Sequence, residues 1–112
     1  MELEVYWTDF SKKELKNIFD YSQENASLNV AKTLVVGITK ETAKLKKQPN
    51  IGQKEELLKK DLRDFRYLVY KSYKIIYLVN LNENRIDVFD VFDTRKKSNK
   101  NSASKIKPAA KS

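Results

Sequence analysis

Apolar and polar residues change their spacing along this chain, and the changes divide it into strand-like and helix-like stretches. Residues 3–7 begin with apolar–polar alternation and are rich in strand formers, so they predict a short first strand. A helix is expected from Ser11 to about Glu24, because Ser11 and Glu14 fit a capping box that satisfies free backbone amides. Behind this cap, one face recurs at helical spacing at Leu15, Ile18, Phe19 and Ser22.

A second helix follows almost at once. Ser27 fits the position of its N-cap, and the pattern continues to about Lys47. The apolar stripe of this helix comprises Val30, Leu34, Ile38 and Leu45, with Ala31 and Val35 beside it. Because only a short turn around residues 25–26 separates the two helices, they are expected to form an antiparallel hairpin.

The second half of the chain has the pattern of a sheet. Residues 48–60 contain Pro49 and Gly52 and predict a loop that can include a helical turn at 54–58. Strands are then expected at residues 65–70, 73–80 and 86–92, with short polar turns between them. The resulting order predicts an α+β, two-layer domain: an N-terminal strand, a helical hairpin and a three-strand antiparallel meander.

The positive charge of the chain is concentrated at its C-terminal end. The net charge is +8, but residues 96–112 contain six lysines and no acid, so residues 1–95 carry only +2. The rest of this segment consists of Ser, Asn, Ala and Pro apart from Ile106, a composition typical of disorder. We therefore predict a domain at residues 1–97 and a disordered, lysine-rich tail at 98–112, and the overall charge alone is a weak argument for nucleic-acid binding.

Several classes of function are disfavoured by composition. The chain has no cysteine and no histidine, which excludes disulfides, thiolate metal sites and a cysteine nucleophile and removes the commonest acid–base side chain. No carboxylate cluster has the spacing of metal ligands, so neither a metal nor a cofactor is expected. The acidic N-terminus does not resemble a signal peptide, and no stretch is long and apolar enough to span a membrane, so a cytoplasmic location is expected.

The strand at residues 73–80 is unusual because its middle is apolar on both faces. Tyr73, Ile75 and Tyr77 alternate with Lys74, Ile76 and Leu78, whereas a sheet with one wet face should alternate cleanly. One interpretation is a central strand that receives additional cover from loops. The other is a concave binding surface on the face away from the helices.

Cations and aromatic residues are expected to converge near the ends of these strands. Arginine binds phosphate as a fork and lysine as a mobile point charge, while aromatic rings can stack on bases. Alternatively, the charges only protect strand edges from aggregation.

In the segment VFDVFDTRKK, Asp90 and Asp93 precede Arg95 and can orient it. The candidate binding residues are Arg63, Arg66, Tyr70, Lys71, Tyr73, Asp93, Thr94, Arg95 and Lys96.

Several segments resemble one known family. The order of elements, together with QPNIGQKEEL, FRYLVYKSYKIIYLVN and IDVFDVFDTRKK, is similar to the RelE/ParE toxins of bacterial type II toxin–antitoxin systems, over residues 3–97. In that family a tyrosine-rich strand precedes a strand that ends in a short segment with an arginine, here Arg95. The resemblance implies a growth-inhibiting toxin that a cognate antitoxin neutralises by tight binding.

The family has two kinds of target, and the sequence favours one of them. RelE-like members cleave messenger RNA on the ribosome, and the resemblance makes Arg95, Lys71 and Arg66 candidates for the catalytic cation. The C-terminal tyrosine or histidine of that pattern is missing, which leaves a lysine, Glu55 or Glu56 as weak candidates for the base. ParE-like members poison DNA gyrase without a nuclease site, and we expect this chain to act in that way.

Two alternatives therefore remain open at the level of sequence. The chain can be a RelE-like ribonuclease, so whether it is an enzyme is undecided, or it can be a non-enzymatic nucleic-acid-binding module that uses its basic tail. The expected partners are an antitoxin and either DNA gyrase or the ribosome with its messenger RNA. An antitoxin is expected to lay an apolar segment on the sheet or the hairpin and to pair acids with Arg95.

Overall fold

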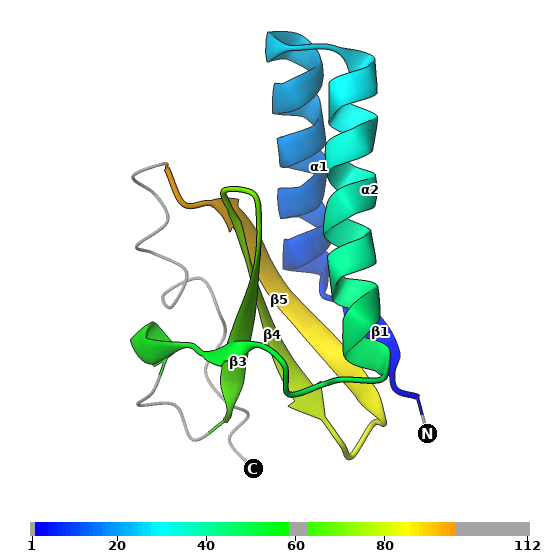
Figure 1. Cartoon of the computed structure of the whole chain (residues 1–112), viewed down its shortest axis with the longest axis vertical. Coiled ribbons are helices and arrows are strands. Elements are labelled where there is room, and N and C mark those ends of the chain that lie inside the picture. Colours follow the sequence, from blue (N-terminus) through cyan, green and yellow to red (C-terminus); the bar gives the residue numbers. More distant parts are fainter. Residues whose placement is uncertain (1, 59–62, 96–112) are drawn as a thin grey trace.

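The computed structural model describes residues 2–58 and 63–95, which form a helical hairpin packed on one face of a twisted sheet (Figure 1). Lys96 and the predicted tail lie outside the described residues. The elements, in chain order, are β1 (Glu4–Trp7), α1 (Asp9–Asn25), α2 (Leu28–Ala43), the 3₁₀ turn η1 (Lys44–Lys46), β2 (Gln53–Lys54), the 3₁₀ turn η2 (Glu56–Leu58), β3 (Phe65–Tyr70), β4 (Tyr73–Asn80) and β5 (Arg85–Asp93).

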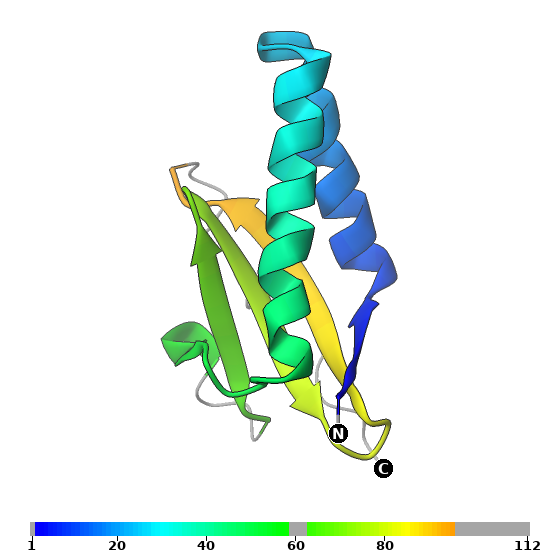
Figure 2. The ribbon, with the colours of Figure 1, turned by 45° about the vertical axis from the view of Figure 1, so that its right-hand side comes forward.

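The sheet is mixed and has five strands in the order β1-β5-β4-β3-β2. The antiparallel meander β3-β4-β5 is confirmed, and β1 pairs with β5 in parallel. The two-residue strand β2 pairs with β3 within the segment that was expected to be a loop. Both helices lie on the same side of the sheet, and their connecting turn projects beyond its edge (Figures 1 and 2). The predicted α+β, two-layer architecture is therefore confirmed.

The first helix begins earlier than the sequence pattern indicated. Thr8 is the N-cap, and its side-chain oxygen accepts a hydrogen bond of 3.1 Å from the backbone N–H of Ser11. Ser11 is fully buried in the first turn and donates from its hydroxyl to the carbonyl of Thr8 at 2.9 Å. The predicted capping box at Ser11 is therefore wrong, because Thr8 already provides the acceptor three residues upstream of that amide.

The second helix agrees better with its pattern. Ser27 is its N-cap, as predicted, and accepts from the backbone N–H of Val30 at 3.1 Å. Leu34, Ile38 and Leu45 of the predicted stripe are buried, whereas the side chain of Val30 is 49% exposed. Val30 lies in the first turn of α2, next to the connecting turn at the projecting end of the hairpin (Figure 1).

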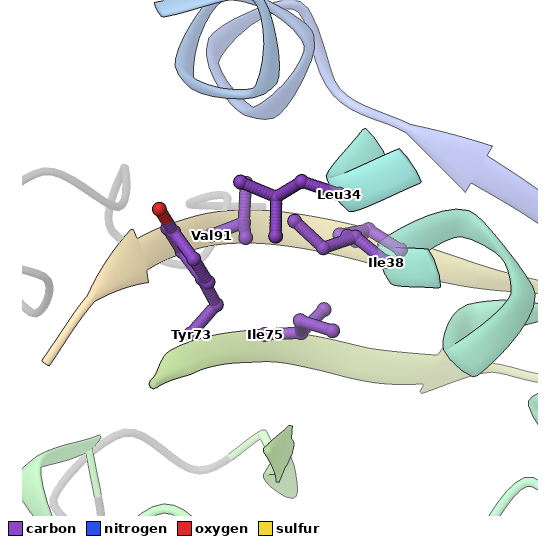
Figure 3. Packing of buried hydrophobic residues seen from close by; sticks show 6 residues of the cluster. Leu34, Ile38, Tyr73, Ile75 and Val91 are labelled. Carbon is purple, nitrogen blue, oxygen red and sulfur yellow. The ribbon is translucent and has the colours of Figure 1, made fainter. Parts of the chain in front are cut away.

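The main core lies between the hairpin and the central strands. Figure 3 shows Tyr73 and Ile75 of β4 and Val91 of β5 directed toward Leu34 and Ile38 of α2. All five side chains are at most 9% exposed. This apolar burial provides the main stabilisation of the two layers.

Two glycines allow tyrosines of the sheet to make close contacts. A Cβ atom at Gly37, in the middle of α2, would lie 2.1 Å from the hydroxyl oxygen of Tyr70, so this ring packs directly on the helix backbone. The hydroxyl of Tyr77 accepts from the backbone N–H of Gly52 at 3.0 Å and donates to the carbonyl of Pro49 at 2.8 Å. These contacts attach β3 to the hairpin and attach the loop before β2 to the sheet.

The opposite face of the sheet has a smaller apolar cluster. Ile76 is 1% exposed and packs with Phe65 of β3 and with Leu58 of η2. The strand β4 is thus apolar on both faces because it is central and because η2 covers part of its second face. Of the two interpretations of this strand, cover from a loop accounts for the burial of Ile76.

Candidate functional site

The C-terminal end of β5 and the turn between β3 and β4 form one corner of the sheet. Thr94 joins them, because its backbone N–H and its hydroxyl both donate to the carbonyl of Ser72, each at 2.8 Å. Lys71 of the turn has a φ angle of 54°, in the left-handed region that few non-glycine residues occupy. We call Lys71, Ser72, Tyr73 and residues 93–95 the β5 corner.

Arg95 is held in the β5 corner by a carboxylate two residues before it. Its Nε and Nη2 atoms donate to Asp93 at 3.0 and 2.8 Å, and its backbone N–H donates to the same carboxylate at 2.9 Å. Asp93 is 7% exposed, whereas the side chain of Arg95 is 73% exposed. The hydrogen bonds from Arg95 lower the pKa of Asp93 to about 2, so this acid stays ionised at neutral pH. The arginine is therefore exposed but fixed in position.

Tyr73 is the other ionisable group beside this pair. It lies opposite Asp93 in the pairing of β4 with β5, and its ring is buried under α2. Burial raises the pKa of its hydroxyl, and the nearby charge of Asp93 raises it further, while Arg95 acts in the opposite direction. A tyrosine with a raised pKa is a weaker candidate for a general base near neutral pH.

The projecting end of the hairpin and the β5 corner enclose a groove of about 630 Å³, which we call the corner groove. The helices α1 and α2 provide an apolar and amide-rich wall, and the β5 corner provides the two cations, Lys71 and Arg95. None of the residues that line it is acidic; they are Tyr21, Ser22, Asn25, Ala26, Asn29, Val30, Thr33, Leu34, Lys71, Ser72, Tyr73 and Arg95. The groove therefore combines positive charge, neutral hydrogen-bond donors and exposed apolar surface.

A second groove, of about 710 Å³, lies between the hairpin and the edge strand β1, and we call it the edge groove. Most of its surface is apolar, and two lysines and one aspartate lie among its lining residues. These residues are Val5, Tyr6, Trp7, Lys12, Leu15, Lys16, Phe19, Asp20, Val35 and Thr39. The pattern analysis placed Leu15 and Phe19 on a core face, but both are only partly buried. The sequence signal for this groove was the apolar stripe of α1, which is wider than the area that the sheet covers.

Comparison with known proteins decides which family this fold represents. Residues 5–97 match the family of ParE toxins of type II toxin–antitoxin systems, parDE. The chain belongs to the ParE toxin family. A solved chain from the chromosomal ParDE TA system of P. aeruginosa has a similar fold, with a TM-score of 0.67 and 16% identity, over 82% of this chain and 96% of that chain. No curated protein matches the sequence.

Membership in the ParE family confirms the prediction of a toxin of the RelE/ParE type. The chain is thus the toxin of a parDE pair, and a ParD antitoxin is implied as its partner. Within residues 2–58 and 63–95, no helix has the length and apolar character that a membrane span requires. The same described residues contain no group of three or more side chains that could hold a metal ion.

The fold of this ParE toxin brings together only some of the residues predicted to act jointly. Lys71, Tyr73, Asp93, Thr94 and Arg95 meet at the β5 corner, whereas Lys96 lies outside the described residues. Tyr70 is adjacent, but its ring packs on Gly37.

The two upstream arginines lie elsewhere and have other partners. The guanidinium of Arg63 stacks on Phe65, with 4.8 Å between its central carbon and the ring centroid. Arg66 donates to Asp64 at 3.2 Å and to the carbonyl of Gly52 at 3.0 Å, so it braces the loop before β2. The expectation that Arg63 and Arg66 converge with Arg95 is therefore corrected. Arg63 packs on Phe65 and Phe89, and Arg66 contacts the loop before β2.

The two acids considered as a general base, Glu55 and Glu56, do not line the corner groove. Glu55 is 3% exposed and forms an ion pair with Lys74 of β4. The ammonium of Lys74 also lies 4.2 Å from the centroid of the Tyr67 ring. Glu55 is not among the residues that line the corner groove, so it does not share that space with Arg95.

Proposed function

We propose that this ParE toxin inhibits growth by binding a protein target of the DNA gyrase type, with Arg95 and the corner groove as the contact surface. The observation that carries the proposal is the chemistry of that groove. It offers a fixed, exposed guanidinium beside a helix wall that is apolar and amide-rich, which suits recognition of a partner surface. Arginine is also among the residues enriched at positions that dominate binding energy.

The same groove is poorly equipped to cleave RNA. Cleavage through a 2′-hydroxyl needs a base to activate it, a cation for the crowded phosphate and an acid for the leaving oxygen. Arg95 can provide the cation, but the lining residues include no carboxylate and the chain has no histidine. Tyr73 is buried and has a raised pKa, so it is a poor base at neutral pH. These features support a binding role rather than a catalytic one.

The ParD antitoxin is proposed to occupy the edge groove. An amphipathic segment would place apolar side chains against Leu15, Phe19 and Trp7 and would pair its acids with the lysines of the rim. Lys12 and Lys16 of α1 both line this groove, and the ammonium of Lys16 forms an ion pair with Asp20 at 2.8 Å that the incoming acids would share. Opposite charges arranged around an apolar patch contribute to partner choice and to the rate of association.

The proposal can be tested in cells that express the chain from an inducible promoter. Replacing Arg95 by Ala should relieve growth inhibition at least tenfold, measured as surviving colonies after induction, while chromosome breaks fall to the uninduced level. The matched control is Arg63→Ala, which removes an arginine that stacks on Phe65 outside the corner groove. Its growth inhibition should stay within about twofold of that of the natural chain. Cleaved messenger RNA without chromosome breaks would contradict the proposed target and would favour the ribonuclease alternative.

A further inference from the structure

The strand β1 presents one side of its backbone at the edge of the sheet. It is the outermost strand and lies beside β5 (Figure 2). The backbone N–H of Thr8 donates to the carbonyl of Val88 in β5 at 3.1 Å, and that of Glu4 donates on the same side. Backbone groups point alternately to the two sides of a strand, so Val5 and Trp7 direct theirs away from β5. Within residues 2–58 and 63–95, no further strand pairs with this side.

The open part of this edge is short and sharply bounded. Before it, the backbone N–H of Leu3 donates to the carbonyl of Lys46 in η1 at 3.1 Å, and after it Thr8 caps α1. Sheet edges are a template for another strand, and charges, proline or a covering element usually protect them. Residues 5–7 include no charge and no proline, and the edge groove shows that the helices do not fill the space beside them.

The open backbone groups are self-complementary. A two-fold axis perpendicular to the sheet and next to Tyr6 would place Val5 of each copy opposite Trp7 of the other, in an antiparallel pair. Each of these two pairs would exchange two hydrogen bonds, which satisfies the open groups of both edges. A shift of the pairing by two residues would engage Leu3, which is bonded to η1, or Asp9, which lies in α1. The two-fold register is therefore determined by the edge itself.

This register also brings together side chains that pair well across strands. Val5 and Trp7 face the helices and are only partly buried, so each would pack on the other beside the edge groove. On the opposite face Tyr6 is 42% exposed, and the guanidinium of Arg85 lies 4.3 Å from the centroid of its ring. Each Tyr6 would lie directly opposite the Tyr6 of the second copy. Aromatic–aromatic and aromatic–β-branched pairs both stabilise antiparallel strands.

We propose that the toxin, when free of ParD, forms a two-fold symmetric dimer through antiparallel pairing of its β1 strands. A second copy fits this edge because each chain provides both halves of the pairing, and the closed symmetry leaves no open group for a third. Glu4 would face the uncharged Thr8, so the register sets no like charges opposite one another. The inference is independent of the gyrase-type target. Because the proposed antitoxin site shares Trp7, its test uses toxin without ParD.

Single cysteines can test the register directly, since the chain has none of its own. Tyr6→Cys would place two thiols on residues whose Cα atoms are about 4.5 Å apart, within the range of disulfides. Glu4→Cys is the matched control on the same face, and its Cα atoms would be roughly 14 Å apart, beyond that range. In mild oxidation of the refolded full-length chains, the Tyr6→Cys chain should form disulfide-linked dimers at least tenfold faster, measured on non-reducing gels.

Sedimentation equilibrium of the chains without cysteine measures the same association with no cross-link. Tyr6→Lys would set two like charges opposite each other and should raise the dissociation constant of the dimer at least tenfold. The control Tyr21→Lys changes a tyrosine of α1 that is also exposed, and it should have less than a threefold effect. Circular dichroism verifies that both variants keep the fold of the natural chain.

Each part of the inference has a result that would overturn it. Equal rates of cross-linking by the two cysteine chains would overturn the register, and a natural chain that stays monomeric would overturn the dimer. A dimer that Tyr6→Lys does not weaken would place the contact elsewhere on the molecule. Because gyrase and ParD are both absent, these outcomes are separate from failure of the proposed function.

Discussion

Arg95 and Asp93 show how a strand end can present one charge and bury another. Asp93 is the last residue of β5 and is almost fully buried. It stays ionised because three N–H groups of Arg95 donate to it. The arginine in turn loses side-chain freedom, so less entropy is lost when it contacts a partner. Asp93 is therefore a positioning residue for Arg95.

The lowered pKa of Asp93 predicts a pH-dependent contribution to stability. Because its pKa is about 2 in the folded chain and lies near 3.8 without these contacts, the contribution is complete above about pH 4 and is lost as the pH falls toward 2. Replacing Asp93 by Asn should lower the free energy of unfolding by about 1 kcal/mol at pH 7, a value reduced for the water that surrounds Arg95.

Urea unfolding of both proteins at pH 7, 4, 3 and 2 measures this difference. The two free energies of unfolding should converge as the pH approaches 2. Glu24→Gln, at an exposed position of α1, controls for the general loss of one negative charge. A difference that stays constant from pH 7 to pH 2 would show that the ionisation of Asp93 does not contribute.

Gly37 provides a second prediction at the scale of single residues. Alanine normally stabilises a helix relative to glycine by about 1 kcal/mol, but here its methyl group would collide with the ring of Tyr70. We therefore expect Gly37→Ala to lower the free energy of unfolding by roughly 1–3 kcal/mol, the usual cost of overpacking. Lys32→Ala, at an exposed position of the same helix, should change it by less than about 0.5 kcal/mol. Stabilisation by Gly37→Ala, measured by thermal or urea unfolding, would refute the close packing.

At the scale of elements, local signals identified most helices and strands. The strands at 65–70 and 73–80 were predicted with their observed bounds, because β-rich runs are separated there by short polar turns. The start of α1 was missed because Ser11 and Glu14 imitate a capping box inside a helix that Thr8 caps. Strand β2 was missed because two residues contain too little pattern, and its pairing with β3 depends on contacts distant in sequence.

The edge groove leads to a prediction about the antitoxin. Replacing Lys12 and Lys16 together by Glu should raise the dissociation constant of the ParD complex at least tenfold, mainly through slower association. The reason is that acids of the bound segment would then face like charges at the rim of the groove. Lys13→Glu with Lys32→Glu, which makes an equal change of charge on α1 and α2 outside the groove, should have less than a threefold effect. Equal weakening by both pairs, measured by calorimetry, would place the antitoxin elsewhere.

At the scale of the whole molecule, the sequence located one part of the site and missed another. Arg95 and Asp93 were recognised because a cationic segment directly follows a β-rich strand. Lys71 was recognised because it lies in the tight turn before the strand at residues 73–80. Asn25, Asn29 and Thr33 were missed because the overhang of the hairpin above the sheet brings them to the corner. Arg63 and Arg66 were wrongly expected to lie beside Arg95, because the sequence pattern does not show at which end of β3 a side chain lies.

We propose that this ParE toxin acts on a gyrase-type protein and does not cleave messenger RNA. The most direct measurement adds the purified chain to two reactions: DNA gyrase with supercoiled plasmid, and ribosomes stalled on a defined messenger RNA. We predict cleaved plasmid trapped on gyrase, lost when Arg95 is replaced by Ala or when ParD is added, together with intact messenger RNA. Cleaved messenger RNA and unaffected gyrase would contradict the proposed target.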